Sequence, residues 1–415
     1  MKILELAQYV FIEKHPSATR KQTGLAYMVR SICDMLSEEN DVHVLTQSVI
    51  SNKMQVGKWL MLKRTYTTIL LHFKWRYLIQ SIKNYRKYKD LGLMRIFLYW
   101  LSAGQVEDYI KQWHPDIIHV HSIGPGLLPF YYAAARQNIP VVSTLHGLIS
   151  FNSLYPKSEA EMNIERAFIK MCVNNGYSMT FISSGMKKMV SELCGNDCTN
   201  ITVILNCYRP TSLDTQYNSL KIDGELHLAC IGTLTPWKNQ IQVIRILPIL
   251  QKNLKNIGKI VLDLYGDGEM REDWQHFCED NHIENVRFHG RVSQNEIFVA
   301  LNNADLLVFP SIEEGFGIPI IEAYSCGTPV VSYPDLDASE DLASDDCIIF
   351  TKDRTDEALI KAITEALLRD WDKKKICEFS RQFTMDAISI KYNDIVKKKH
   401  KVWTLESIKS VIDSY

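Results

Sequence analysis

Short apolar runs alternate with helical patterns along both halves of the 415-residue chain. Apolar runs of about five residues, separated by helical segments, are typical of parallel sheets that helices cover on both faces. In the first half the expected strands are 2–6, 42–46, 116–120, 140–144, 179–183 and 201–205. In the second half they are 226–232, 260–265, 285–289, 305–309 and 329–333. The pattern predicts an α/β protein with two Rossmann-like, doubly wound domains.

The chain is longer than one hydrophobic core usually supports, so we expect two domains. Residues 207–225 are polar and irregular and include Pro210, which fits a linker. This places the domains at 1–206 and 226–380, with C-terminal helices over 381–415 that pack back on the first domain. Two such domains that face each other would bind a ligand in a central cleft, at the carboxyl ends of their strands.

Composition excludes several classes of protein. The chain has 47 Lys and Arg against 48 Asp and Glu, and 46% of its residues are hydrophobic, which is typical of a globular protein and not of a general nucleic-acid binder. No secretory signal precedes the first expected strand, and no apolar run reaches the roughly 18 residues of a membrane span. The ten cysteines are scattered without C-x-x-C spacing. We therefore expect reduced thiols and a cytoplasmic location.

Residues 311–329 carry two carboxylates on either side of a glycine-rich turn. Glu314 and Glu322 lie eight positions apart, with Gly315-Phe316-Gly317 and then Pro319 between them. A buried strand before the turn and a helix that begins near Pro319 are predicted. Free N–H groups at a helix start favour an anion, and glycine lets the backbone approach a phosphate. A phosphate cradle between two hydroxyl-binding carboxylates indicates a nucleotide-sugar site; two solvated glutamates are the alternative.

Three further motifs follow expected strands in the second half. Gly232-Thr233-Leu234 ends one strand, and Lys238-Asn239 follows before a helix, where a lysine can place its ammonium on a diphosphate. Gly266-Asp267-Gly268 and Gly290-Arg291 follow the next two strands. Neither of the G-x-G turns has the third glycine of a G-x-G-x-x-G fingerprint, which disfavours a nicotinamide dehydrogenase.

In this order the motifs resemble those of glycosyltransferase family 4, retaining enzymes of the GT-B fold. The patterns G-x-L-x-x-x-K-N, G-D-G, F-x-G-x-V, A-D-x-x-V-x-P-S and E-G-F-G-x-P-x-x-E-A all occur between 226 and 333. The resemblance is to the bacterial surface-polysaccharide type. It implies a hexosyltransferase that takes a UDP- or GDP-linked sugar as co-substrate, with no other cofactor and no metal.

The resemblance also implies roles for individual residues. Glu314 matches the glutamate that contacts donor-sugar hydroxyls, and Lys238 matches the lysine that neutralises the diphosphate. Glu322 matches the glutamate that holds the ribose diol, and His146 matches a histidine near the reacting sugar. Glu314, His146 and Lys238 are the expected catalytic residues. The expected donor-binding residues are Gly24, Gly232, Thr233, Lys238, Asn239, Phe316, Gly317, Ile318 and Glu322.

The chain departs from the family pattern at the phosphate site. Thr233 stands where the family has an arginine, and Arg209 or Arg291 would have to compensate. The family's first-loop double glycine is here Thr23-Gly24. These differences concern the phosphate contacts and not the fold.

Some residues resemble ligand sites but have a simpler interpretation. Asp335 and Asp337 form a D-x-D triplet, which binds a divalent cation in glycosyltransferases of another fold. Here the triplet lies among further acids and reads as a solvated turn. A histidine after a strand is often a satisfied core residue, and we interpret His43, His119 and His121 in this way.

Residues 53–95 form a basic and aromatic segment. They include eleven Lys or Arg and one acid, Asp90. At about 100° per residue, the following fall on one predicted helical stripe: Trp59, Leu62, Tyr66, Ile69, Leu70, Phe73 and Tyr77. The pattern favours docking on an anionic membrane, and a core-facing helix with a basic rim is the alternative. The predicted membrane-binding residues are Lys58, Lys63, Arg64, Lys74, Arg76, Trp59 and Phe73.

The sequence thus predicts a retaining glycosyltransferase that moves a hexosyl sugar from a nucleotide-sugar donor to a glycan acceptor. A lipid-linked acceptor would place it on the inner face of the cytoplasmic membrane, in O-antigen or capsule assembly. Nucleic-acid binding is disfavoured because the basic residues are confined to one segment. A sugar-nucleotide epimerase of similar fold, or a catalytically silent family member, remains the alternative.

Overall fold

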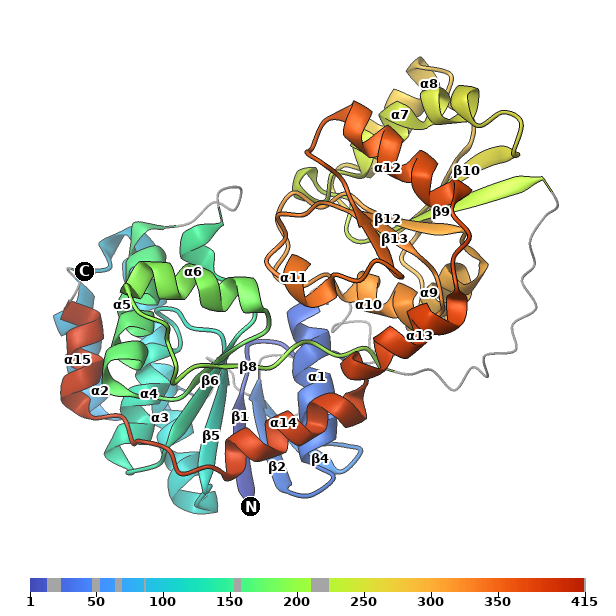
Figure 1. The fold of residues 1–415 in the computed structure, drawn as a ribbon. Helices are drawn as coiled ribbons and strands as arrows, with labels where there is room; N and C mark the ends of the chain where they lie inside the picture. Colours follow the sequence, from blue (N-terminus) through green and yellow to red (C-terminus); the bar gives the residue numbers. More distant parts are fainter. Residues whose placement is uncertain are drawn as a thin grey trace. The chain divides into compact units, whose positions relative to one another are not determined.

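The computed structural model describes residues 1–12, 24–46, 53–63, 69–85, 87–152, 158–209 and 224–413. The chain forms two compact units, each built on its own sheet with helices packed against it (Figure 1). The first unit comprises Met1–Leu205 and Ile388–Tyr415, and the second comprises Asn206–Ala387. The expected linker, 207–225, falls mostly on 210–223, outside the described residues.

The sheet of the first unit has the strand order β3-β4-β2-β1-β5-β6-β7-β8. Its strands are β1 (Lys2–Leu6), β2 (Asp41–Thr46), β3 (Lys53–Val56), β4 (Trp59–Lys63), β5 (Ile117–His121), β6 (Val141–Leu145), β7 (Met179–Phe181) and β8 (Thr202–Val203). Every pairing is parallel except the β3–β4 hairpin. The six strands predicted in this half are confirmed, and the hairpin was not predicted.

The first unit contains helices from both ends of the chain. They are α1 (Gly24–Leu36), α2 (Trp75–Tyr85), α3 (Leu93–Trp113), α4 (Leu128–Arg136), α5 (Glu159–Asn175), α6 (Ser184–Cys194), α14 (Met385–Lys397) and α15 (Leu405–Asp413), with short 3-10 turns at Lys89–Leu91 and Ile149–Phe151. Ser158 and Glu161 form a capping box at the start of α5, and Gly176 ends it in the left-handed conformation.

Residues after Ile388 belong to the first unit. Asn393 on α14 accepts a hydrogen bond from Asn40, at 3.0 Å. Trp403, between α14 and α15, is buried and stacks on Tyr177 with ring centroids 4.0 Å apart. These contacts attach the end of the chain to the sheet layer formed near its beginning.

The predicted helical stripe from Trp59 to Tyr77 is wrong. Residues 53–63 form the β3–β4 hairpin, and β4 pairs in parallel with β2. Trp59 is buried, and its Nε1 donates a hydrogen bond to Asp34 at 2.6 Å. This segment forms strands and not a helix because β2 offers hydrogen-bond partners for its backbone and the segment is apolar on both faces. Tyr66, also on the predicted stripe, lies outside the described residues.

The sheet of the second unit has the order β11-β10-β9-β12-β13-β14, and all of its pairings are parallel. Its strands are β9 (Glu225–Ile231), β10 (Lys259–Tyr265), β11 (Val286–Gly290), β12 (Leu306–Phe309), β13 (Val330–Ser332) and β14 (Ile348–Phe350). The five strands predicted here are confirmed, and β14 is additional. The buried side chains of Leu228, Leu262 and Val308 bring the three central strands into one core.

The helices of the second unit connect these strands. They are α7 (Gln240–Asn253), α8 (Arg271–Asp280), α9 (Gln294–Asn303), α10 (Ile318–Ser325), α11 (Ser339–Leu342), α12 (Asp356–Leu368) and α13 (Lys373–Ser380), with 3-10 turns at Pro236–Lys238 and Arg381–Phe383. As the sequence predicts, α10 has a proline in its first turn and ends before Gly327.

Candidate functional site

The strand order defines a switch point in the second unit. The chain places β10 and β11 on one side of β9 and then returns to place β12 on the other side (Figure 1). Ligands of parallel α/β sheets bind outside the carboxyl ends of the strands at such a point. The loops that leave β9 and β12 carry Lys238 and Glu314, respectively.

Glycines allow the loops that follow β9 and β10 to approach each other closely. The amide of Leu234 donates to the carbonyl oxygen of Asp267 at 3.2 Å. A Cβ on Gly266, whose φ is +139°, would lie 1.9 Å from the carbonyl oxygen of Gly232. A Cβ on Gly268 would lie 2.2 Å from the carbonyl oxygen of Leu234. The glycines of the G-D-G motif are therefore required for the backbone of one strand exit to lie against that of the next.

Lys238 and Glu314 form an ion pair across the switch point. The Nζ of Lys238 donates to a carboxylate oxygen of Glu314, and both side chains are 21% exposed. The same Nζ lies 5.4 Å from the centroid of the Phe309 ring. Residues 76 positions apart thus bring a cation and a carboxylate together. A bound diphosphate would compete for the ammonium and free the carboxylate for hydroxyl groups.

Helix α10 begins shortly after Glu314 in the sequence. Gly317 caps the helix with φ at 90°. Pro319 has no N–H, and the N–H of Ile320 donates to the carbonyl oxygen of Gly317 at 2.9 Å, so among the first three helix residues Ile318 is the one whose N–H these features leave available. Phe316 is buried against Phe383 with ring centroids 6.2 Å apart. The backbone around Ile318 is therefore held in place by packing on one side while its N–H groups suit an anion.

Glu322 is a buried carboxyl group near the first turn of α10. The Nε2 of Gln294 donates to its Oε1 at 2.6 Å. Burial raises the pKa of Glu322 to about 8, and the Gln294 hydrogen bond opposes this only in part. Gln294 was missed at the sequence level, although its place at the start of α9, directly after the exit of β11, was a usable signal. A buried carboxyl without a cation suits hydrogen bonds with ligand hydroxyls.

The other predicted donor-binding residues occupy plainer positions. Gly24 opens α1, and the preceding Thr23 lies outside the described residues. Thr233 is exposed, and its carbonyl oxygen accepts a hydrogen bond from Gln240 at 3.3 Å. Asn239 caps α7 in the left-handed conformation, and its side chain donates to Gln242 at 2.7 Å. The Asn239 amide therefore has a local structural role.

The two carboxylates of the D-x-D triplet do not act together. Asp335 accepts hydrogen bonds from Arg354 at 2.9 and 2.7 Å. Burial raises the pKa of Asp337 to about 7, with help from the charges of Glu314 and Glu313. Arg354 also donates to the carbonyl oxygens of residues 311 and 312, so it braces the loop before Glu314.

In the first unit, His146 follows β6 and meets a buried polar network. Its Nε2 lies 3.0 Å from Nδ1 of His121, whose Nε2 lies 2.7 Å from a carboxylate oxygen of Glu5. His119 contacts the same carboxylate at 3.0 Å. Donor atoms of Glu5, His119 and His121 lie within 4.8 Å of one another and could in principle surround a metal. Glu5, His119 and His121 already contact one another by hydrogen bonds, so these three side chains have polar partners within the protein.

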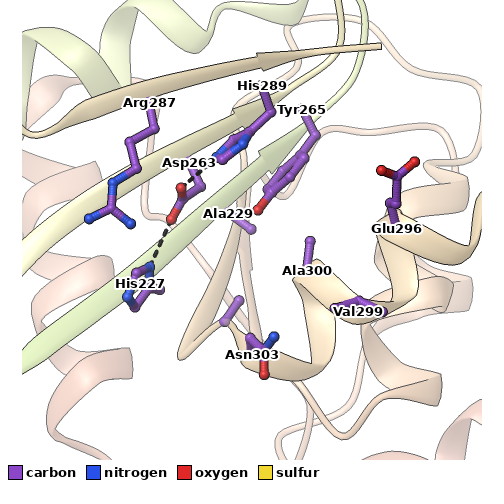
Figure 2. A pocket seen from close by; sticks show the side chains of 11 residues that line it. His227, Ala229, Asp263, Tyr265, Arg287, His289, Glu296, Val299, Ala300 and Asn303 are labelled. Atoms are coloured by element: carbon purple, nitrogen blue, oxygen red, sulfur yellow. Dashed lines mark hydrogen bonds and ion pairs between the residues drawn. The ribbon is translucent and has the colours of Figure 1, made fainter. Parts of the chain in front are cut away.

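A separate hollow of about 310 Å³ lies in the second unit (Figure 2). It is lined by His227, Ala229, Asp263, Tyr265, Arg287, His289, Glu296, Val299, Ala300, Asn303 and Ala304. Asp263 accepts hydrogen bonds from His227 at 2.8 Å and from His289 at 2.7 Å, as the dashed lines in Figure 2 show. None of the predicted donor-binding residues lines this hollow, so it is distinct from the switch-point site.

Most of the predicted membrane-binding cations pair with acids. Lys58 pairs with Glu38, Lys74 with Asp108 and Arg76 with Glu107. The prediction is wrong for Trp59, which is buried on β4, whereas Phe73 is partly exposed and Lys63 is half-buried. Arg64 lies outside the described residues.

Comparison with known structures identifies the fold. Sucrose-phosphate synthase from Thermosynechococcus elongatus superposes with a TM-score of 0.69 at 14% identity, covering 95% of this chain and 98% of that one. Anabaena HepE, solved in complex with UDP and glucose, superposes with a TM-score of 0.61 at 16% identity, covering 95% and 99%. Two parallel-sheet units with these neighbours define the GT-B class that the sequence predicted.

Comparison of sequences identifies the family. Residues 23–211 match the model described as Glycosyltransferase Family 4, and residues 214–383 match the model described as Glycosyl transferases group 1. The chain therefore belongs to glycosyltransferase family 4, as its motifs indicated.

Individual relatives are more distant. Glycogen synthase of Mycobacterium tuberculosis is 27% identical over 224 residues, which cover 54% of this chain and 53% of that protein. The O-antigen chain mannosyltransferase RfbU of Salmonella typhimurium is 28% identical over 189 residues, which cover 45% and 50%. The chain thus spans about half the length of these curated relatives.

Proposed function

We propose that this protein is a retaining glycosyltransferase that moves a hexosyl sugar from a UDP- or GDP-linked donor to a glycan acceptor. The observation that carries the proposal is the Lys238–Glu314 pair at the switch point of β9 and β12, next to the N-terminus of α10. It supplies a cation and helix N–H groups for a diphosphate and a carboxylate for sugar hydroxyls. Glu322, buried in the same helix, supplies the carboxyl group for the ribose diol.

The proposed chemistry follows from these groups. The bond between the anomeric carbon and the diphosphate oxygen breaks, and a bond to the acceptor oxygen forms on the same face of the sugar. The acceptor's proton passes to the departing diphosphate. Lys238 and the amides at Gly317 and Ile318 stabilise the negative charge that builds on that diphosphate. Because the acceptor oxygen attacks the anomeric carbon directly, the site needs no carboxylate nucleophile, and because the diphosphate takes the proton, it needs no separate general base.

We further propose that the acceptor is a lipid-linked glycan in surface-polysaccharide assembly. The similarity to an O-antigen chain mannosyltransferase supports this acceptor class. Work on such an acceptor would hold the protein at the inner face of the cytoplasmic membrane. No helix in the described parts of the chain has both the length and the apolar character that crossing a membrane requires.

The exposed face of α2 supports this membrane contact. Trp75, Ile79 and Ile82 follow the i, i+4, i+7 spacing of one helix face and are 71%, 48% and 58% exposed. The opposite face buries the polar residues Ser81 and Asn84. This inverts the usual pattern of a surface helix, since the apolar stripe faces outward. Further exposed apolar residues lie nearby in the sequence: Leu70, Leu71, Leu93 and Met94. The exposed cations Lys83 and Arg95 add the positive charge that suits a helix at the surface of an anionic membrane.

Two assays test the proposal. Nucleotide release from UDP-, GDP- and dTDP-sugars should rise when a glycan acceptor is added, and Lys238→Ala should abolish it while the exposed Lys252→Ala leaves it unchanged. Release that is independent of acceptor, or unaffected by Lys238→Ala, would contradict the transferase.

Flotation with anionic vesicles tests the membrane surface. The triple variant Trp75→Ser, Ile79→Ser, Ile82→Ser should bind at least about tenfold more weakly, because it removes three apolar side chains from the interface. Replacing the exposed Ile249 and Ile390 by serine is the matched control and should leave binding unchanged. Equal binding by the triple variant and the wild type would rule out α2 as the docking surface.

A further inference from the structure

The buried network of the first unit lies at a second switch point. The chain places β2 on one side of β1 and β5 on the other, and Glu5 near the end of β1 lies directly opposite His119 in the β1–β5 register. His121 is two residues further along β5, on the same face of the sheet as His119. His146 follows β6, the next strand. Strand pairing therefore delivers one carboxylate and three imidazoles to the same sheet end.

The carboxylate of Glu5 is ionised and fully buried. Burial alone would raise its pKa, but His119, followed by the hydrogen bond from His121, outweighs burial and lowers the pKa of Glu5 to about 2. An ionised carboxylate only accepts hydrogen bonds. The Nε2 of His121, 2.7 Å from the carboxylate, must therefore carry a proton and donate it.

This donation fixes the tautomers along the chain of contacts. Burial and the neighbouring His119 lower the pKa of His121, which keeps its imidazole neutral and leaves its Nδ1 as an acceptor. The Nε2 of His146, 3.0 Å away, must then donate to that Nδ1. Burial lowers the pKa of His146 well below its usual value, so this imidazole is neutral as well. Its own Nδ1 is consequently left unprotonated.

The Nδ1 of His146 is a buried acceptor that has no partner among the described residues. A buried polar atom without a hydrogen bond costs about 1 to 3 kcal/mol, so such atoms usually meet a ligand or water. The other arm of the network is closed, since His119 contacts Thr144 at 2.7 Å and Thr144 contacts Thr180 at 2.7 Å. Only the arm that ends at His146 leaves an acceptor open.

We infer that Glu5 and His121 are positioning residues that set the tautomer of His146, so that its Nδ1 accepts a hydrogen bond from a hydroxyl group of the bound sugar or acceptor. The ligand assignment rests on the proposed function, whereas the tautomer does not. Glu5 acts through His121. It holds the proton of His121 on Nε2, so that His121 Nδ1 accepts the proton of His146 Nε2 and the Nδ1 of His146 stays unprotonated. Loss of either contact frees the imidazole of His146 to rotate or to place its proton on Nδ1.

The test combines spectroscopy with kinetics on the full-length protein. Protein labelled with ¹⁵N in its histidines should show His146 protonated on Nε2 and bare on Nδ1. His121→Phe and Glu5→Leu, which remove one link each, should convert His146 to a mixture of tautomers. Both should also lower kcat at least tenfold and change the donor KM less than threefold. Thr180→Val, at the closed end of the network, is the matched control and should change neither the His146 signals nor kcat.

The outcomes are distinguishable. A proton on Nδ1 of His146 in the wild type, or the same single tautomer in wild type and both variants, would overturn the inference. If Glu5→Leu does not fold, His121→Phe decides alone, because its ring is close in size to imidazole. If the tautomer is as stated but no nucleotide sugar is turned over, the proposed function fails and the role of Glu5 and His121 in setting the tautomer stands.

Discussion

Two buried glutamates, one in each unit, have opposite electrostatic surroundings. Glu5 accepts hydrogen bonds from two imidazoles, and its pKa is lowered to about 2. Glu322 accepts one hydrogen bond, from the neutral amide of Gln294, and burial raises its pKa to about 8. The carboxylate of Glu5 is stabilised in its ionised form by partners within the protein. The carboxyl group of Glu322 is not, which is expected of a group that meets a polar ligand.

The two switch points also differ in what shapes them. In the first unit, side chains on β1 and β5 fill the strand ends with polar contacts, and only His146 faces outward from the network. In the second unit, Gly266 and Gly268 let the loops after β9 and β10 approach closely, and Lys238 of the β9 loop pairs with Glu314 of the β12 loop. We infer that the first site is held rigid by hydrogen bonds, while the second exchanges an internal ion pair for its ligand.

The largest effect is expected at Glu314, whose carboxylate is paired within the protein but available to a ligand. Glu314→Ala should lower turnover at least about 100-fold, the scale for removing a key electrostatic contact. Initial rates at saturating donor and acceptor measure it, with the exposed Glu340→Ala as the control. Near-normal turnover would mean that the Lys238–Glu314 ion pair has only a structural role.

The next effect concerns the closely approaching loops after β9 and β10 in the second unit. Gly266→Ala should lower the free energy of unfolding by about 2 kcal/mol, because the new Cβ meets a backbone oxygen and the φ is unfavourable for alanine. Denaturant unfolding measures this loss. Gly124→Ala, where a Cβ meets nothing within 4 Å, should stay within about 0.5 kcal/mol of the wild type. Equal stability of the two variants would remove the distinction between the two switch points.

The smallest effect, taken per pH unit, separates the two glutamates by pH. With its pKa raised to about 8, Glu322 is protonated in the folded protein where the unfolded chain has already lost the proton, so rising pH favours unfolding. Between about pH 5 and 8 the free energy of unfolding should fall by on the order of 1 kcal/mol per pH unit relative to Glu322→Gln. Glu5, with a lowered pKa, adds no slope there; its stabilisation is lost only below the unfolded value, toward pH 2. A flat difference between wild type and Glu322→Gln would contradict the contrast.

Much of the second site was predictable from sequence. Lys238 and Glu314 each follow a short apolar run that can only be a buried strand, and neighbouring parallel strands end at the same edge. Their meeting follows from that rule. The closing contact from Gln294 to Glu322 was not predictable, because it depends on how α9 packs beside α10.

The first unit was less predictable for two physical reasons. Residues 59–63 read Trp-Leu-Met-Leu-Lys, which is apolar at every position but the last, so neither helical nor strand periodicity could be distinguished. His119 and His121 are buried and hydrogen-bonded, as the sequence analysis expected, but their shared partner Glu5 was not predicted. Glu5 is the one acid within residues 2–6, which are otherwise mostly apolar, and His119 and His121 are two positions apart, which puts both imidazoles on one face. Strand order was needed to bring them together.

The central claim is that a nucleotide sugar's diphosphate binds at the start of α10. A crystal structure of the protein with a UDP- or GDP-sugar tests it most directly. We predict the diphosphate within hydrogen-bond distance of Lys238 Nζ and of the amides at Gly317 and Ile318, with Glu314 released from the lysine. A nucleotide bound instead in the hollow between His227 and His289 (Figure 2), with the Lys238–Glu314 pair intact, would contradict the account.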